Sequence, residues 1–98
     1  MIIYQFDYDV QKSLKLKKER KISFEEIISL IEEGRVIDIL EYPNQNKYKG
    51  QKIFLIDIED YIWLVPFRQD GEKIILITVF PSRKLTKTYK RAVNEKKK

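Results

Sequence analysis

The chain has 98 residues, of which 43% are hydrophobic and 36% charged, a composition typical of a folded domain rather than a disordered segment. Its formal net charge is +5, and it contains neither cysteine nor histidine. Disulfides, thiolate metal sites, almost every zinc site and Ser-His-Asp catalysis are therefore excluded. We expect a single domain over residues 1–98, without a metal or another cofactor.

The first elements predicted are a short strand at residues 2–6 and a helix that ends near Arg20. Asp7 or Asp9 can cap this helix, and Val10 and Leu14 are its apolar positions. Six bases gather in its second half or just beyond it: Lys12, Lys15, Lys17, Lys18, Arg20 and Lys21. They can complement the helix dipole or contact an anion, and the sequence leaves both interpretations open.

A second helix follows, with clear signals at both ends. Ser23 and Glu26 have the spacing of a capping box, in which each side chain accepts a hydrogen bond from the other residue's backbone N–H. Phe24, Ile27, Ile28 and Ile31 recur at helical spacing and predict the buried face, and Gly34 predicts the C-terminal stop.

Four strands are predicted next, at residues 36–41, 52–58, 61–68 and 73–80, with a turn-rich loop at 42–50. The short turns at 59–60 and 69–72 predict an antiparallel meander. Residues 61–68 carry apolar side chains at both alternating sets of positions, so this strand should be central and covered on both faces. Pro66 indicates a bulge or a free edge there. The predicted fold class is α+β, with the meander sheet packed against the N-terminal helices.

Residues 82–98 form a basic segment with eight bases and one acid, a net charge of +7, whereas residues 1–81 sum to −2. Ser82 can cap a final helix with an apolar stripe at Leu85, Tyr89, Ala92 and Val93. A positive segment on a near-neutral body favours binding to a polyanion, because phosphate contacts release counterions. The alternative is a solvated, lysine-rich terminus.

Three segments in this order resemble BrnT-type toxins. Phe6-Asp7-Tyr8-Asp9, then Lys12, then Ile22-Ser23-Phe24-Glu25-Glu26 resemble the family's "WD..K…GISFEEA" start. Ser82-Arg83-Lys84-Leu85-Thr86 resembles its "SARKAT" signature, and a helix with a tyrosine follows in both. The resemblance implies a RelE-like type II toxin, a compact α+β ribonuclease with a basic C-terminal helix that a cognate antitoxin protein neutralises.

The chain departs from that family in three places. Glu19-Arg20-Lys21 replaces the usual Lys-His-Gly, Arg68-Gln69-Asp70-Gly71 replaces a Glu-Arg-Gly hairpin, and Thr78 stands near a position that is often arginine. These departures indicate a divergent branch with altered or weak catalysis.

Without histidine, RNA cleavage requires alignment of the 2′-hydroxyl and stabilisation of charge on the phosphate. Arg83, at a strand-to-helix junction, is the first catalytic candidate, because its planar fork binds two phosphate oxygens. Arg68 and Tyr89 are further candidates. Arg68, however, should lie near the turn of its hairpin, at the opposite end from Arg83, and Tyr89 can equally be a core residue. Candidates for phosphate binding are Lys84, Lys87, Lys90 and Arg91. Asp57, Glu59 and Asp60 are interpreted as a solvated turn rather than a metal site.

The expected function is thus that of an endoribonuclease toxin that cleaves RNA by metal-independent transesterification. The alternatives are a non-catalytic RNA- or protein-binding domain, and a structural partner whose basic helix docks an acidic antitoxin. The N-terminus has no signal-peptide pattern, and the apolar run at 61–67 is too short to span a membrane, so a cytoplasmic location is expected. A homo-oligomer is compatible with the sequence.

Overall fold

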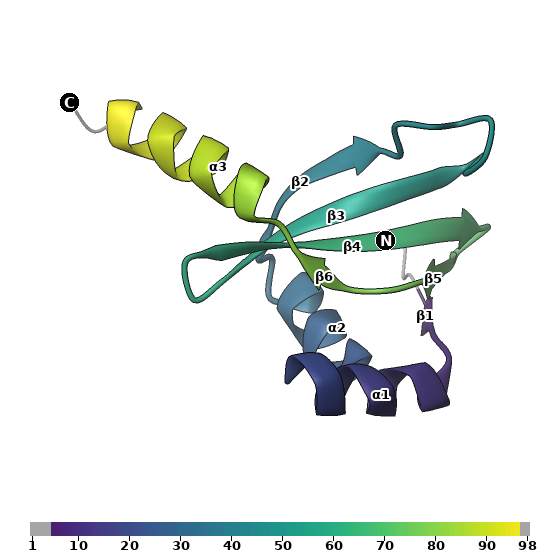
Figure 1. Cartoon of the computed structure of the whole chain (residues 1–98). Coiled ribbons are helices and arrows are strands. Elements are labelled where there is room, and N and C mark those ends of the chain that lie inside the picture. Colours follow the sequence, from purple (N-terminus) through teal and green to yellow (C-terminus); the bar gives the residue numbers. More distant parts are fainter. Residues whose placement is uncertain (1–4, 97–98) are drawn as a thin grey trace.

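The computed structural model describes the backbone of residues 5–96 and the side chains of residues 5–89. Its elements are β1 (Gln5–Asp7), α1 (Val10–Arg20), α2 (Phe24–Glu32), β2 (Val36–Glu41), β3 (Gln51–Ile58), β4 (Tyr61–Asp70), β5 (Lys73–Leu76), β6 (Phe80–Pro81) and α3 (Arg83–Lys96) (Figure 1). The fold is α+β, with a mixed six-stranded sheet and three helices. None of the helices in this described part is long and apolar enough to cross a membrane. Residues 2–4 of the first predicted strand lie outside the description.

The sheet has the strand order β1-β5-β4-β3-β2, and β6 pairs with β4 beyond the end of β5. Strands β2 to β5 form the antiparallel meander predicted from the short turns. At the other edge β1 lies parallel to β5, with Gln5 beside Lys73, so the sheet is mixed rather than antiparallel throughout. Short turns predict antiparallel neighbours only, whereas two helices and three strands separate β1 from its partner β5 in the sequence.

The strand predicted at residues 73–80 is two strands, because residues 77–79 leave the ladder between β5 and β6. Pro66 lies opposite this gap, and its carbonyl oxygen accepts a hydrogen bond from Ile77 N–H at 2.9 Å. The N–H and C=O groups of one strand residue point to the same side, so the missing donor of Pro66 falls where the ladder is interrupted. The bulge or free edge predicted from Pro66 is therefore an interruption of the strand that pairs with β4.

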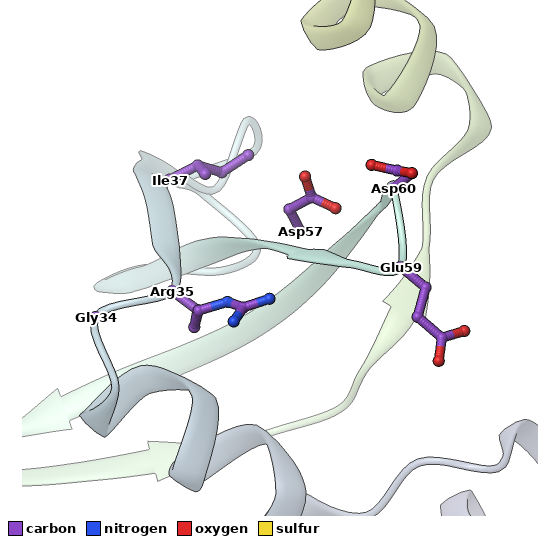
Figure 2. Close-up of a pocket in the computed structure, with 6 residues that line it drawn as sticks. All are labelled: Gly34, Arg35, Ile37, Asp57, Glu59 and Asp60. Atoms are coloured by element: carbon purple, nitrogen blue, oxygen red, sulfur yellow. The ribbon is translucent and has the colours of Figure 1, made fainter.

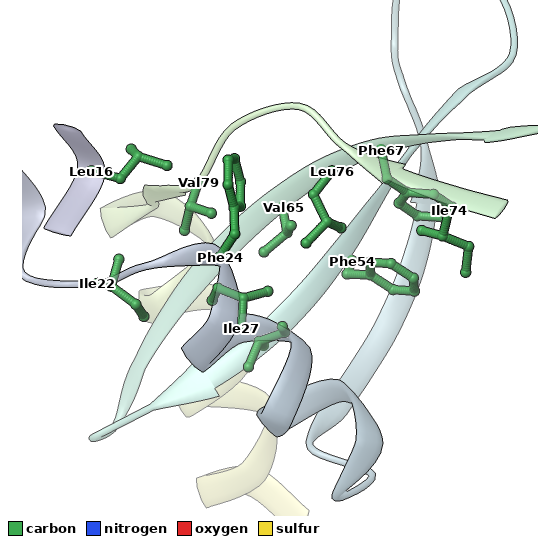
Figure 3. Packing of buried hydrophobic residues seen from close by; sticks show 11 residues of the cluster. Leu16, Ile22, Phe24, Ile27, Phe54, Val65, Phe67, Ile74, Leu76 and Val79 are labelled. Atoms are coloured by element: carbon green, nitrogen blue, oxygen red, sulfur yellow. The ribbon is translucent and has the colours of Figure 1, made fainter. Parts of the chain in front are cut away.

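Strand β4 is central and contributes to an apolar cluster on each face, as predicted from its two apolar sets. Helices α1 and α2 cover one face over a cluster of Leu16, Ile22, Phe24, Ile27, Phe54, Ile56, Val65, Phe67, Ile74, Leu76 and Val79 (Figure 3). On the opposite face Ile53, Leu55 and Ile62 form a second cluster, against which Leu85 and Tyr89 of α3 pack. The sheet therefore separates the N-terminal helices from α3.

Helix α1 begins at its predicted cap but buries a different face. Asp9 Oδ1 accepts hydrogen bonds from the backbone N–H groups of Gln11 (2.9 Å) and Lys12 (3.2 Å). Val10 and Leu14 are 59% and 62% exposed, so the predicted apolar face was wrong. The buried residues are Ser13 and Leu16, three positions apart on one side of the helix. Because Ser13 is polar, an analysis of hydrophobic spacing does not identify this face of the helix as the buried one.

Helix α2 confirms its sequence signals. Ser23 Oγ accepts from Glu26 N–H at 3.2 Å, and Glu26 Oε2 accepts from Ser23 N–H at 3.4 Å, which completes the predicted capping box. Phe24 and Ile27 are fully buried in the main cluster, and the chain turns out of the helix at Gly34, whose φ is +79°. Glycine adopts this left-handed conformation without a steric penalty.

A polar network joins α1, and Tyr8 just before it, to α2. Tyr8 Oη donates to Glu25 Oε1 at 2.7 Å, and Ser13 Oγ donates to Glu25 Oε2 at 2.8 Å. Ser13 Oγ also accepts from Phe24 N–H at 3.0 Å, so its hydroxyl is satisfied inside the interface. The hydrogen bond from Tyr8, together with those from the backbone and from Ser13, lowers the pKa of Glu25 from 4.5 to about 2.

Replacement of Ile27 by alanine should cost about 2–5 kcal/mol of unfolding free energy, because it leaves a cavity in the main cluster. Leu14→Ala is the matched control on the exposed side of α1 and should change stability by less than about 0.5 kcal/mol. Denaturant unfolding of both variants measures the two values. A loss under about 0.5 kcal/mol for Ile27→Ala would contradict the packing of α2 on the sheet.

The Glu25 network should make stability depend on acid. Because the folded-state pKa of Glu25 lies below its unfolded value, the carboxylate stabilises the fold above pH 4.5 and loses this effect as the pH falls toward 2. The difference in melting temperature between wild type and Glu25→Gln should therefore be largest near neutral pH and shrink in acid. Glu32→Gln, an exposed position of the same helix, is the control. A difference that stays constant from pH 7 to pH 2 would refute the assignment.

Candidate nucleic-acid interface

Helix α3 is capped by Ser82, as the sequence predicts. Ser82 Oγ accepts from Leu85 N–H at 3.2 Å, and the Ser82 carbonyl oxygen accepts from Thr86 N–H at 3.1 Å. The first N–H groups of a helix have no partner within the helix. Among the described residues, the backbone N–H groups of Arg83 and Lys84 have no acceptor outside the helix either. They can face an anion at this end of α3.

Thr86 fastens the first turn of α3 to strand β4. Its Oγ1 accepts from Ile62 N–H at 2.8 Å and donates to the Ser82 carbonyl oxygen at 2.6 Å. Ser82 N–H in turn donates to the Ile62 carbonyl oxygen at 2.9 Å. Thr86 is 6% exposed, so both of its hydrogen bonds are shielded from water. The orientation of α3 is thus fixed by polar contacts at one point of the sheet.

The segment 82–86 divides into two sets of residues. Ser82 caps, Leu85 packs on the second cluster and Thr86 anchors, and these three turn inward. Arg83 and Lys84 are exposed, as is Lys87 one turn further. Within residues 5–89 none of these three cations forms an ion pair, so their charge is available to a ligand. Lys90 and Arg91 lie in α3, but their side chains are outside the described part.

Tyr89 is half-buried at the end of the second cluster, and its hydroxyl donates to Asp38 Oδ2 of β2 at 3.1 Å. Burial, followed by the hydrogen bond and the charge of Asp38, raises the pKa of Tyr89 above its usual 10. A phenol with a raised pKa is a weaker proton donor. This geometry favours the core interpretation of Tyr89, in which the side chain ties α3 to β2.

Arg68 is exposed near the far end of β4 and is paired with Gln51 of β3 and Ile75 of β5. Six positions of β4 separate it from Ile62, where α3 is anchored, a separation of about 20 Å at the usual rise of a strand. Arg68 and Arg83 are therefore not brought together, and they cannot bind the same phosphate group in this arrangement.

An acidic pocket of about 420 Å³ lies beside the β3–β4 turn, lined by Gly34, Arg35, Ile37, Asp57, Glu59 and Asp60 (Figure 2). Glu59 and Asp60 form the turn itself, with φ values of +52° and +66°. Three carboxylates against one guanidinium make this pocket unfavourable for a phosphate. Within the described residues no group of three or more acidic, histidine or cysteine side chains is arranged to hold a metal ion.

A second hollow, of about 330 Å³, lies on the face of the sheet that α1 and α2 cover. It is lined mainly by apolar side chains, namely Phe6, Ile31, Val36, Ile39, Phe54, Phe67 and Ile74, with Lys52 and Gln69. Of the candidate catalytic residues, only Arg68 is close to this lining in the sequence, as the neighbour of Gln69. The hollow therefore offers no additional group for the chemistry expected at α3.

Sequence reasoning located Ser82 and the exposed bases but missed the partners that position them. Thr86 anchors the helix, and Asp38 accepts the hydrogen bond of Tyr89. A signal for Thr86 exists, because a threonine four residues after a cap can bond back to the carbonyl oxygen of the cap. The contact to Ile62 carries no signal in the local sequence.

Comparisons of the chain with protein-family models, with curated proteins and with solved structures give no match.

Replacing Thr86 by valine, which has nearly the same shape, should leave Ile62 N–H buried without an acceptor and cost about 1–3 kcal/mol of unfolding free energy. Thr88→Val is the matched control: its Oγ1 also donates to a helix carbonyl, that of Lys84, but the residue is exposed. We expect that control to change stability by less than about 0.5 kcal/mol. Equal effects of the two substitutions in thermal or denaturant unfolding would argue against the anchor.

Proposed function

We propose that this protein is an endoribonuclease of the RelE-like group, a BrnT-type toxin of a type II toxin–antitoxin pair. The proposal includes a RelE-like fold for this α+β domain and a basic surface along residues 82–98 that binds RNA in the cytoplasm. The observation that carries it is the fixed, exposed and unpaired Arg83 at the start of α3, within the segment that resembles the toxin signature.

In the proposed reaction, the enzyme binds RNA so that a 2′-hydroxyl is in line with its adjacent phosphate. Arg83 binds two oxygens of that phosphate and stabilises the charge that develops on them, and the N–H groups at the start of α3 contribute to the same field. Lys84 and Lys87, exposed on the same helix, bind flanking phosphates. The reaction forms a 2′,3′-cyclic phosphate and releases a 5′-hydroxyl, and it requires no metal.

A non-catalytic RNA- or protein-binding domain is the second candidate, and two observations favour it. Tyr89 is held by Asp38 and has a raised pKa, and Arg68 lies about 20 Å from the anchor of α3 along β4. Arg83 and its lysine neighbours then remain for charge stabilisation, and the described residues provide no strong general base beside them. In this candidate the same surface binds RNA, or an acidic antitoxin, without cleaving it.

Replacement of Arg83 by alanine should reduce RNA cleavage by roughly two to three orders of magnitude, the effect of removing one donor to a developing oxyanion. Arg83→Lys should also be poor, because an ammonium group cannot reproduce the two-pronged contact of a guanidinium. The melting temperature should stay unchanged for both variants, since the side chain is exposed. Induced expression, with growth and RNA integrity followed together, compares these variants with wild type.

Arg68→Ala is the matched control, an exposed arginine that the sheet holds far from α3, and it should cleave as well as wild type. Full cleavage by a folded Arg83→Ala protein would remove Arg83 from the mechanism. An intact RNA pool with wild type, together with measurable RNA binding by the purified protein, would favour the non-catalytic candidate.

A further inference from the structure

Strand β4 begins with an aromatic side chain that the core does not use. Tyr61 is 36% exposed and belongs to neither core cluster. Trp63, two positions along the strand, is half-buried and packs against the main cluster. Successive strand residues alternate between faces, so the two rings lie on the same face, that of the main cluster, about 7 Å apart along the strand. An exposed tyrosine beside a partly exposed tryptophan offers π-faces to a planar ligand.

This aromatic pair lies at the point where α3 begins. Trp63 is paired with Pro81 of β6, and the hydrogen bond from Ser82 N–H to the Ile62 carbonyl oxygen continues that register by one residue. The next residue along the chain is Arg83, and the next position back on β4 is Tyr61. Facing positions of paired strands lie about 5 Å apart. Tyr61 and Arg83 each lie one residue from the hydrogen-bonded residues Ile62 and Ser82, so the start of α3 lies near the beginning of β4.

Charged groups around the pair determine how RNA could approach. Arg20, at the end of α1, donates a hydrogen bond to the Val79 carbonyl oxygen, two residues before Pro81, and so brings the basic end of α1 to the same segment. Glu59 and Asp60 immediately precede Tyr61 and repel phosphates. A nucleotide can then place its phosphate beside Arg83 and only its uncharged base over Tyr61.

We propose that Tyr61, supported by Trp63, is the base-stacking residue of an RNA-binding site whose phosphate is held at Arg83. The inference rests on the proposed function and deepens it, because it identifies single-stranded RNA with an unstacked base as the ligand. Proteins that bind single strands combine a basic groove with aromatic side chains on which bases stack. Any of the four bases can stack in this way, so the binding does not depend on sequence. Duplex RNA, whose bases are already stacked, should bind more weakly.

Trp63 is the only tryptophan of the chain and provides a reporter. A mixed-sequence, single-stranded RNA of about twelve nucleotides, titrated at low salt, should quench its fluorescence as bases approach. Tyr61→Leu should weaken binding of that RNA by roughly 5- to 150-fold, the range measured for loss of one aromatic stacking partner. Tyr61→Phe keeps the ring and should bind like wild type.

Inorganic polyphosphate, an anion without bases, is the probe that separates stacking from charge. Its affinity should be the same for wild type and Tyr61→Leu, and should fall when Arg83 is replaced by alanine. Unchanged RNA affinity in a folded Tyr61→Leu protein, or an equal loss for RNA and polyphosphate, would overturn the stacking role while leaving the proposed function intact. Failure of wild type both to bind and to cleave RNA would instead overturn the proposed function, and the stacking role with it.

Discussion

The central constraint in this fold is that strand β4 must be covered on both faces. Val65 and Phe67 point to one side and are almost completely buried, and Ile62 is buried on the other. Exposed apolar area costs roughly 25 cal/mol per Å², so neither face can remain open to water. The chain meets this requirement with elements from both ends of its sequence: α1 and α2 on one side, and α3 on the other. The placement of Arg83 follows from this division.

Among the side chains that the structure describes, α3 meets the sheet through polar as well as apolar contacts. Leu85 supplies apolar contact with the second cluster, but the hydrogen bonds that Thr86 and Ser82 form with Ile62 fix the helix at one point of the sheet. A helix held mainly by such directional contacts keeps a defined angle, because hydrogen bonds weaken steeply when they are misaligned. The exposed cations of that turn are consequently presented by a rigid support rather than by a loose tail.

Charge is distributed unevenly around the β3–β4 turn. Asp60 of this turn lies two residues before Ile62, to which Ser82 at the start of α3 is hydrogen-bonded, and Arg83 and Lys84 are exposed there. A polyanion is attracted to one side of this boundary and repelled from the other, so its path over the surface is restricted. Under the proposed function, this acidic turn would direct a bound RNA toward the α3 side of the boundary.

Local signals in the sequence predicted the elements whose ends depend on nearby residues. The capping box at Ser23 and Glu26, the cap at Ser82 and the two-residue turn at Glu59 and Asp60 are such features, and each is present. Partners that are distant in the sequence were not predictable: β1 pairs with β5, and the hydroxyl of the buried Ser13 donates a hydrogen bond to a carboxylate of another helix. Hydrophobic spacing cannot detect a buried serine, which is why α1 was assigned the wrong face.

The same distinction applies to the candidate site. Arg83 could be chosen from sequence because a cap, a strand end and a base coincide within a few residues. That the start of α3 lies near the beginning of β4 could not be predicted in this way. This position depends on the register of β6 on β4, which the gap opposite Pro66 shifts away from that of a simple hairpin. Residues that are brought together by such a register are invisible to motif searches.

The arrangement also limits the rate that the proposed chemistry could reach. Alignment of a 2′-hydroxyl with its phosphate lowers the barrier by fixing geometry, and a stacked base is one way to fix it. Charge stabilisation by one guanidinium and nearby backbone N–H groups adds a few orders of magnitude, but the phenol of Tyr89 is engaged with Asp38 and adds little as a proton donor. An enzyme built in this way would depend mainly on how rigidly it holds the nucleotide. Its activity would then be sensitive to substitutions such as that of Thr86, which loosen α3 without touching the RNA.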